Sequence, residues 1–476
     1  MAGMGEEISR SEFEAADFAR FNARLAGETD LLREQFGQGR LASAGYAFGF
    51  EIEVWLLDHG YFPNSINEAF LARLNHPLVV PELSRFNVEL NSVPLQLHGD
   101  ALLRAEMELE RLWRHCNAVA HAMDANMVMI GTLPTIRDED LSLDNISPLK
   151  RYHALNHEVL RRRQGRPLRV DIAGRERLVA EHGDVMLEAA TTSFQVHLQA
   201  PAALAHRFYN ASLAVSGPLL AACGNAPFLF GRSLWEETRI PLFEQAVDLA
   251  GLHAGSRRVT FGEDYLRRSV LECFEENLRE YPVLLPLEFP DRPHEFRHLR
   301  LHNGTIWRWN RPLLGFDEDG RPHVRIEHRI LPAGPSILDM LANAAAYLGM
   351  VYALVHEGED ETLGLPFATA RRNFYAAARD GLRARLEWPG ADETSPRDLL
   401  EGELLPRAAR GLARLDIDAE DIERYLGVLG ARLAGGATGA AWQQACFESR
   451  GRDFYELMAT YCERQRSRAP VHEWDL

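Results

Sequence analysis

The chain has 476 residues, of which 46% are apolar and 25% charged, proportions that are ordinary for a soluble globular protein with room for a large core and an added domain. Its 69 acidic residues outnumber its 52 lysines and arginines, giving a formal net charge of -17. This acidic balance argues against nucleic acid or an anionic membrane as the main partner, although carboxylates that bind magnesium can still recruit ATP.

The N-terminal residues and the cysteines give no sign of export. The first 20 residues are polar and acidic and lack the apolar segment of a signal peptide. The five cysteines show no CxxC spacing and are odd in number, which argues against a disulfide framework or a cysteine zinc site. The longest apolar helical stretch, residues 337–356, contains Asp339 and Asn343, so we interpret it as a buried helix rather than a membrane span. We expect a cytoplasmic protein with no membrane partner.

The predicted elements alternate irregularly between helix and strand. An amphipathic helical pattern over residues 11–38 opens the chain. Strand patterns follow at 46–57, 85–91, 127–133, 193–199, 305–310 and 323–330. Helical patterns lie between them, near 101–125, 150–163, 201–216, 264–280 and 335–356. Because there is no regular βαβ period, we predict an α+β fold with an antiparallel sheet.

The character of the chain changes near residue 357. Strand patterns vanish there, and alanine, leucine and arginine dominate from Ala368 to Arg468. We predict an N-terminal helical segment of residues 1–44, a main domain of residues 45–356 and a helical C-terminal extension of residues 357–476.

Two glutamates share one face of a short apolar strand, GFEIEVWLL at residues 49–57. Strand side chains alternate, so Phe50 and Ile52 point toward a core while Glu51 and Glu53 point together to the other side. Unpaired carboxylates beside a core are costly and repel each other, so a shared cation is the simplest explanation.

Three further strands repeat this alternation. Each has one apolar side and one side with a carboxylate or imidazole, namely Glu89, His197 and Glu327. Such a polar face is usually solvated and inert, but an inert face mixes threonine, serine and both charge signs, whereas this one concentrates glutamate and histidine. If the four strands pair, we predict a sheet with helices on its apolar face and, on its polar face, a metal site with Arg329 beside it.

The residue types on this face favour phosphoryl transfer. Oxygen ligands with one imidazole suit magnesium or manganese, and two such ions next to an arginine form a phosphoryl-transfer site. The sequence contains neither GxxxxGK[ST] nor a GxGxxG after a strand, so ATP would have to be held through metals and arginines.

The motifs resemble those of the type 2 glutamate–cysteine ligase (carboxylate–amine ligase) family in both residues and order. The matching stretches are GFEIE (49–53), VEL (88–90), QVHL (195–198) and RIEHR (325–329). Further matches are Glu82, seven residues before Glu89, and the segments GTLP (131–134), Arg151-Tyr152, NAP (225–227) and Arg311-Pro312. The resemblance covers roughly residues 45–356 and implies the catalytic fold of glutamine synthetase.

The resemblance also implies a role for each matching residue. The magnesium ion between the ATP phosphates would be held by Glu51, His197 and Glu327. The ion nearer the acceptor carboxylate would be held by Glu53, Glu82 and Glu89. Arg329 would contact the transferred phosphoryl group, and the amino-acid substrate or phosphate would be contacted by Arg151, Tyr152 and Arg311. The implied chemistry is phosphorylation of a carboxylate, followed by attack of an amine on the acyl phosphate to give an amide.

Three departures from the family pattern leave the second substrate open. Smaller members have His-x-His where this chain has Gln195-Val196-His197. The C-terminal 120 or so residues have no counterpart in those members, and the segment near residues 282–293 is divergent.

We therefore predict a ligase that depends on ATP and Mg²⁺ (or Mn²⁺) and joins glutamate to cysteine or a similar amine. Its partners would be small-molecule amino acids and amines. A homo-oligomer is one of the assemblies that the sequence allows. Three alternatives stay open: a phosphagen-type kinase, an inactive nucleotide- or amino-acid-binding relative, and a zinc peptidase. The last rests on HEFRH at residues 294–298, a literal HExxH pattern in a chain with 18 histidines.

Overall fold

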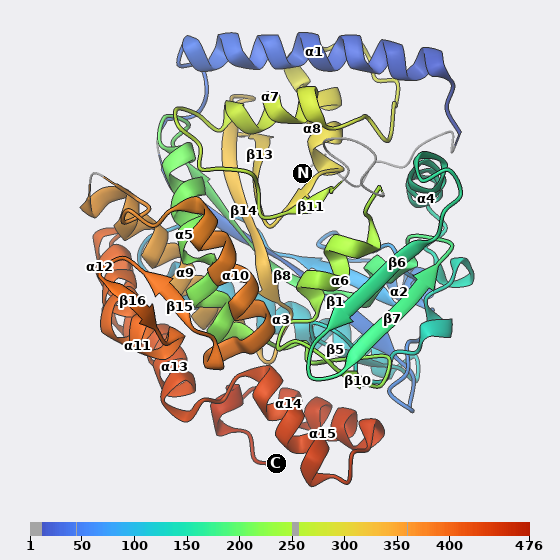
Figure 1. Ribbon diagram of the computed structural model, residues 1–476, viewed down its shortest axis with the longest axis vertical. Helices are drawn as coiled ribbons and strands as arrows, with labels where there is room; N and C mark the ends of the chain where they lie inside the picture. Colours follow the sequence, from blue (N-terminus) through green and yellow to red (C-terminus); the bar gives the residue numbers. More distant parts are fainter. Residues whose placement is uncertain (1–11, 44, 250–256, 359) are drawn as a thin grey trace.

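The computed structural model describes residues 12–43, 45–249, 257–358 and 360–476. Its centre is an antiparallel sheet of eight strands in the order β13-β14-β8-β1-β3-β2, with β4 and β5 also paired to β1 (Figure 1). The strands are β1 (Ala47–Leu57), β2 (Val79–Pro81), β3 (Asn87–Asn91), β4 (Leu95–Gln96), β5 (Asn126–Val128), β8 (Ser193–Ala200), β13 (Asn310–Phe316) and β14 (Pro322–Pro332). The predicted α+β class with an antiparallel sheet is confirmed.

The α-helices surround this sheet. Those of the first half are α1 (Ala15–Gly37), α2 (Asn67–Leu74), α3 (Ala101–His121), α4 (Lys150–Arg162), α5 (Ala205–Cys223), α6 (Arg239–Ala246), α7 (Leu271–Glu280) and α8 (Arg297–Gly304). Those of the second half are α9 (Ile337–Glu357), α10 (Phe367–Asp380), α11 (Pro396–Leu399), α12 (Leu405–Arg414), α13 (Ala419–Gly435), α14 (Gly439–Ser449) and α15 (Phe454–Ser467).

Several short strand pairs lie outside the central sheet. They are β6 (Leu168–Ala173) with β7 (Arg177–His182), β9 (Phe228–Leu229) with β10 (Arg232–Ser233), β11 (Val259–Thr260) with β12 (Trp307–Arg308), and β15 (Leu386–Trp388) with β16 (Ala391–Thr394). The sequence analysis missed the β6–β7 hairpin. The expectation of a C-terminal extension without strands was wrong, because the turn Trp388-Pro389-Gly390 connects a hairpin there.

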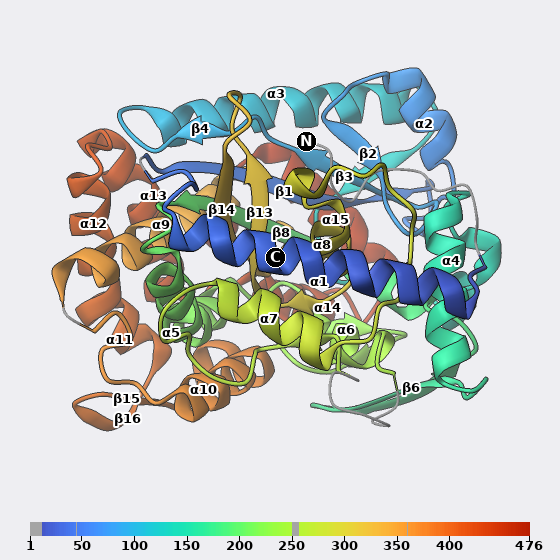
Figure 2. The same ribbon diagram turned by 90° about the horizontal axis from the view of Figure 1, so that it is seen from above.

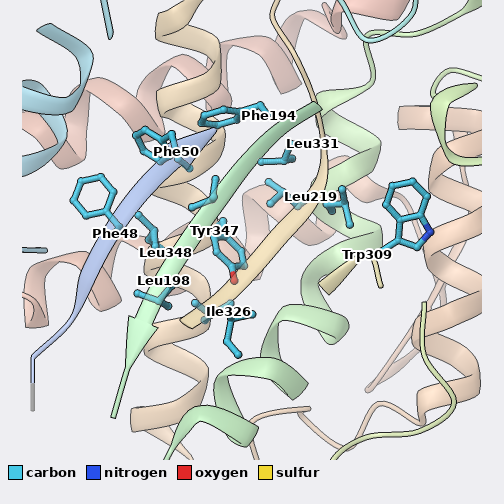
Figure 3. Close-up of a cluster of buried hydrophobic side chains, with 14 of the residues drawn as sticks. Phe48, Phe50, Phe194, Leu198, Leu219, Trp309, Ile326, Leu331, Tyr347 and Leu348 are labelled. Atoms are coloured by element: carbon cyan, nitrogen blue, oxygen red, sulfur yellow. The ribbon is translucent and has the colours of Figure 1, made fainter. Parts of the chain in front are cut away.

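The apolar face of the sheet packs on α5 and α9 (Figure 3). Phe50 of β1, Phe194 of β8 and Leu331 of β14 lie over Tyr347 of α9 and Leu219 of α5, all within one buried cluster. In the described residues α9 is the one helix long and apolar enough to cross a membrane, but 89% of its apolar window is buried inside the protein. The interpretation of this stretch as a core helix is confirmed.

The side of α9 away from the sheet packs against the C-terminal helices, and the backbone of α12 contacts that of α9. A Cβ added at Gly411 of α12 would lie 2.0 Å from the carbonyl oxygen of Gly349 in α9, and a Cβ at Gly349 would lie 2.3 Å from that of Ala408. The two helices therefore approach more closely than any other residue type would allow.

We expect Gly411→Ala to destabilise the protein by about 1 to 3 kcal/mol, because the added methyl group would push α12 away from α9. Gly427→Ala is the matched control: a Cβ at this position of α13 meets nothing within 4 Å. That change should stabilise by about 0.5 to 1 kcal/mol. Urea unfolding measures both, and equal effects would contradict the close crossing.

Helix α1 spans α7 and α8 at one end of the molecule (Figures 1 and 2). Ion pairs hold it there, from Arg20 to Glu288 at 2.8 Å and from Arg33 to Glu275 at 2.8 Å. The amphipathic N-terminal helix predicted from the sequence thus packs on a segment more than 200 residues away.

Candidate active site

The sheet register brings the predicted acidic residues onto one face. Glu53 of β1 lies opposite Glu89 of β3, and Glu327 of β14 lies opposite His197 of β8. Glu51 precedes Glu53 by two residues on β1, so its side chain lies on the same face of the sheet. The prediction that these four strands pair into one sheet is confirmed, and the residues are not scattered.

The first cluster consists of Glu53, Glu82 and Glu89. Each offers one carboxylate oxygen, and the three oxygens lie within 4.8 Å of one another. Among the described residues, the hydrogen-bond donors to these side chains are neutral: the Ser193 amide donates to Glu53 at 2.6 Å, the Leu83 amide to Glu82 at 3.1 Å and the Asn91 side chain to Glu89 at 2.8 Å. The cluster therefore has acceptor oxygens in excess of donors.

Burial and mutual repulsion raise the pKa values of Glu53 and Glu89 in this cluster. Burial, followed by the charge of Glu82, raises the pKa of Glu53 to about 7. Burial and the charges of Glu51, Glu82 and Glu53 raise the pKa of Glu89 well above its ordinary value. A bound divalent cation would remove this penalty, so the three residues fit a magnesium or manganese site.

The second cluster consists of Glu51, His197 and Glu327. His197 Nε2 lies 3.2 Å from Glu51 Oε1. Burial raises the pKa of Glu51, but the charges of His197 and then Arg325 outweigh it and bring the pKa down to about 2. Within the described chain, His197 Nε2 and Glu327 Oε1 are buried and make no hydrogen bond of good geometry; their charged neighbours are Glu51 Oε1 at 3.2 Å and Arg329 Nε at 3.7 Å. Ligand atoms of this kind on adjacent strands fit a cation between them.

Arg311 holds Glu327 from the next strand. Its Nη2 donates to Glu327 Oε2 at 2.8 Å, and its Nη1 donates to the backbone carbonyls of Asn303 and Gly304 at 3.3 Å. The Arg311 side chain is fully buried, so this geometry supports a positioning role. Its direct contact with substrate or phosphate stays a prediction.

Arg329 is set differently from Arg311, because two of its nitrogens make no hydrogen bond to the described residues. The register of β14 shifts between His328 and Leu331, and such a bulge re-aims side chains. The guanidinium lies over the ring of Phe243, with Arg329 Nε 3.7 Å from Glu327 Oε1. In the described residues Arg329 Nε and Nη1 have no hydrogen-bond partner, which is the arrangement needed to meet an anionic group.

Arg151 and Tyr152 lie near the first cluster at the start of α4. Arg151 Nη2 donates to the Tyr152 hydroxyl at 2.8 Å, and that hydroxyl donates to the Pro81 carbonyl at 3.2 Å, next to Glu82. Among the charges acting on Glu82, that of Arg151 lowers its pKa, although burial raises it overall. Both residues border the site as expected, while their contact with a substrate stays a prediction.

Two residues of the site were missed or left out by the sequence analysis. Strand alternation places Arg325 on the face of Glu327, opposite Gln199, but it was not assigned a role in the site. Glu188 lies in the 3₁₀ turn η3 (Met186–Ala190), where no periodic signal marks it. Burial and the charges of Glu82 and Glu53 raise the pKa of Glu188 to about 8.

The substituted position in the family's His-x-His motif has a defined contact. Gln195 Nε2 donates to Glu53 Oε1 at 3.0 Å. The residue that replaces the first histidine therefore supports a predicted metal ligand.

The HExxH pattern does not form a zinc site. Phe296 adopts a left-handed conformation (φ 51°) that separates the turn Pro293–Glu295 from α8, so the pattern does not share one helix. His298 is buried and bonded through Nδ1 to Glu28 at 2.6 Å, whereas His294 is exposed. The HExxH spacing presumes one continuous helix, and it cannot reveal that a single residue within it, Phe296, adopts a left-handed conformation.

Comparisons with known proteins agree with this geometry. The family described as glutamate-cysteine ligase family 2 (GCS2) matches residues 47–456. Comparison with curated proteins gave no match.

Two solved structures share the fold. One is glutamate–cysteine ligase from Francisella tularensis in complex with AMP, with 12% identity, 90% coverage of both chains and a TM-score of 0.53. The other is a bifunctional glutathione synthetase from Pasteurella multocida, with 13% identity and a TM-score of 0.51, covering 92% of this chain and 54% of that one.

The glutamine synthetase-like fold expected from the sequence motifs is thus confirmed. The family match spans the strands that carry both carboxylate clusters and continues into α15. The chain belongs to glutamate–cysteine ligase family 2.

Proposed function

We propose that this protein is an ATP-dependent carboxylate–amine ligase that joins the γ-carboxylate of glutamate to the amine of cysteine or a similar compound. The observation that carries this proposal is the pair of adjacent clusters, Glu53–Glu82–Glu89 and Glu51–His197–Glu327, with Arg329 beside them, whose Nε and Nη1 make no hydrogen bond to the described residues. Two cation sites next to a cationic side chain suit the transfer of a phosphoryl group to a carboxylate.

Each cluster would hold one magnesium or manganese ion. Glu51, His197 and Glu327 would hold one ion, and Glu53, Glu82 and Glu89 would hold the other. When bound, such ions neutralise phosphate oxygens and orient them.

The protein side chains then have separable tasks. Arg329 would contact the transferred phosphoryl group through its guanidinium, and Arg311 would keep Glu327 in place through the 2.8 Å ion pair. Arg151 and Tyr152 would contact the amino-acid substrate. Transfer to a carboxylate gives an acyl phosphate, from which an amine displaces phosphate to form the amide.

An amino-acid panel tests this function. Purified protein with ATP and magnesium should release ADP only when both an acid and an amine are present, and the product mass should be that of the amide. ADP release with a phosphorylated product and no amide would instead show the phosphagen-type kinase. Heat stabilisation by nucleotide without ADP release would show an inactive binding relative. We place the enzyme in the cytoplasm, acting on small molecules, and gel filtration decides whether it forms a homo-oligomer.

A further inference from the structure

The bulge in β14 that aims Arg329 is held by a buried arginine on another element, Arg239 of α6. The register of β14 shifts between His328 and Leu331. Two residues of β14, Arg329 and Ile330, therefore face a single residue of β8. Because an extra residue of this kind disrupts the ladder of backbone hydrogen bonds, the carbonyl groups at the bulge need donors from outside the sheet.

Arg239 supplies those donors. Its Nη1 donates to the Arg329 carbonyl at 3.2 Å, and its Nη2 donates to the Ile330 carbonyl. Its Nε donates to Glu237 Oε1 at 3.0 Å, which fixes the plane of the guanidinium. Arg239 is 2% exposed and Glu237 is fully buried, so bulk water does not compete for these contacts. Each nitrogen of the guanidinium thus has a protein partner, which fits support of the bulge rather than contact with a substrate.

The same face of α6 also supports the side chain of Arg329. Phe243 follows Arg239 by four residues, so the two lie on one face of the helix. The central carbon of the Arg329 guanidinium lies over the Phe243 ring, 5.3 Å from its centroid. The Arg329 amide donates to the Trp309 carbonyl at 3.1 Å, and the Trp309 ring in turn lies under the Arg239 guanidinium. One helix therefore holds both the backbone and the guanidinium of Arg329.

We propose that Arg239 is a positioning residue, which holds the bulge so that the guanidinium of Arg329 meets the transferred phosphoryl group. This inference rests on the proposed function, in which Arg329 makes that contact. Two carbonyl groups fixed by one planar fork set the direction of the strand at the residue that must meet the developing charge. A misplacement of about 1 Å at such a residue can lower the rate about 100-fold. Loss of the fork should therefore lower turnover without changing nucleotide binding.

The test compares Arg239→Lys with wild type. Lysine keeps a positive charge beside Glu237 but cannot donate to both carbonyl groups as a planar fork. The kcat for ADP release should fall about 10- to 100-fold, while KM for ATP and the magnesium concentration at half-maximal rate should stay within about twofold. A raised magnesium requirement would place the effect at Glu327 instead and overturn the role assigned through Arg329.

Arg432→Lys is the matched control for the loss of a buried arginine. Arg432 is 1% exposed, forms an ion pair with Asp339 at 3.0 Å and donates to the carbonyl groups of Ala222 at 3.2 Å and Asp339 at 3.3 Å. None of these partners lies in β14. Both variants should unfold at a lower urea concentration than wild type, but only Arg239→Lys should lower kcat. An equal fall of kcat in both would show a general effect of destabilisation and overturn the proposal.

A double-mutant cycle with Arg329→Ala separates positioning from a merely structural role. If Arg239 acts through Arg329, Arg239→Lys should change kcat by less than about twofold once residue 329 is alanine. A second loss of about 10-fold or more in that background would overturn the proposal, as would normal turnover of Arg239→Lys alone. Should Arg239→Lys not fold, Glu237→Gln, which removes the charge that anchors Arg239 Nε, gives the same cycle with the same expected pattern. A wild-type enzyme that forms no amide with any amine would refute the proposed function itself, a separate result.

Discussion

Glu53→Gln and Glu327→Gln should each lower the rate of ADP release by about 1,000-fold or more, because each removes one anionic ligand from a different cation cluster. Glutamine keeps the size of the side chain and one acceptor oxygen, so the amide of Ser193 still has its partner at position 53. The measurement is steady-state ADP release over a magnesium titration, with Glu181→Gln, on the exposed face of β7, as the control. Near-normal turnover in both variants would refute the site.

The same two variants should differ in stability. In the metal-free protein the pKa of Glu53 is raised to about 7, so folding disfavours its charge and Glu53→Gln should be neutral or stabilising at pH 8. Glu327 has a lowered pKa: burial opposes its charge, but Arg311 and Arg329 outweigh it. Removing that charge leaves buried Arg311 less compensated, so Glu327→Gln should cost about 1 to 3 kcal/mol. Urea unfolding without metal distinguishes them, and circular dichroism checks that both fold.

Arg329→Ala should lower kcat by about 1,000-fold while changing nucleotide affinity by less than about tenfold. The reason is that charge develops on the phosphoryl group during transfer, whereas the ground-state nucleotide would be held mainly by the carboxylate-bound cations. Arg329→Lys should recover only part of the rate, since a point charge cannot replace the planar fork.

Arg321→Ala is the matched control, because Arg321 lies in the turn between β13 and β14 and is 54% exposed. Single-turnover kinetics with nucleotide binding measured separately gives the two quantities. An unchanged rate in Arg329→Ala, or a loss confined to nucleotide affinity, would remove the role assigned to it.

Much of the carboxylate face could be predicted because strand alternation is a local rule. Glu51, Glu53, Glu89, His197 and Glu327 each lie within a strand whose apolar neighbours fix the direction of the side chain. The order of the strands in the sheet depends on residues far apart in the sequence. However, strands that each have one apolar and one polar side must all turn the apolar side to the core, which leaves few other arrangements.

Residues outside strands needed other information or were missed. Glu82 follows β2 and enters the first cluster through a loop, so only the family resemblance pointed to it. Glu188 lies in a 3₁₀ turn whose other residues are all buried and apolar, and nothing in its spacing distinguishes it from a solvated glutamate. The zinc site suggested by the HExxH pattern was wrong because the left-handed residue Phe296 divides the motif between a turn and a helix.

The glycine crossing of α9 and α12 links the active site to the far end of the chain. β14, which carries Glu327 and Arg329, ends at Pro332, and α9 begins at Ile337 with the C-terminal helices against its other side. Apolar residues from the sheet, from α9 and from α12 form one buried cluster, so unfolding of either part exposes the other. Occupancy of the carboxylate face should therefore slow proteolytic cleavage in α12 and α13, although none of the candidate site residues lies in these helices.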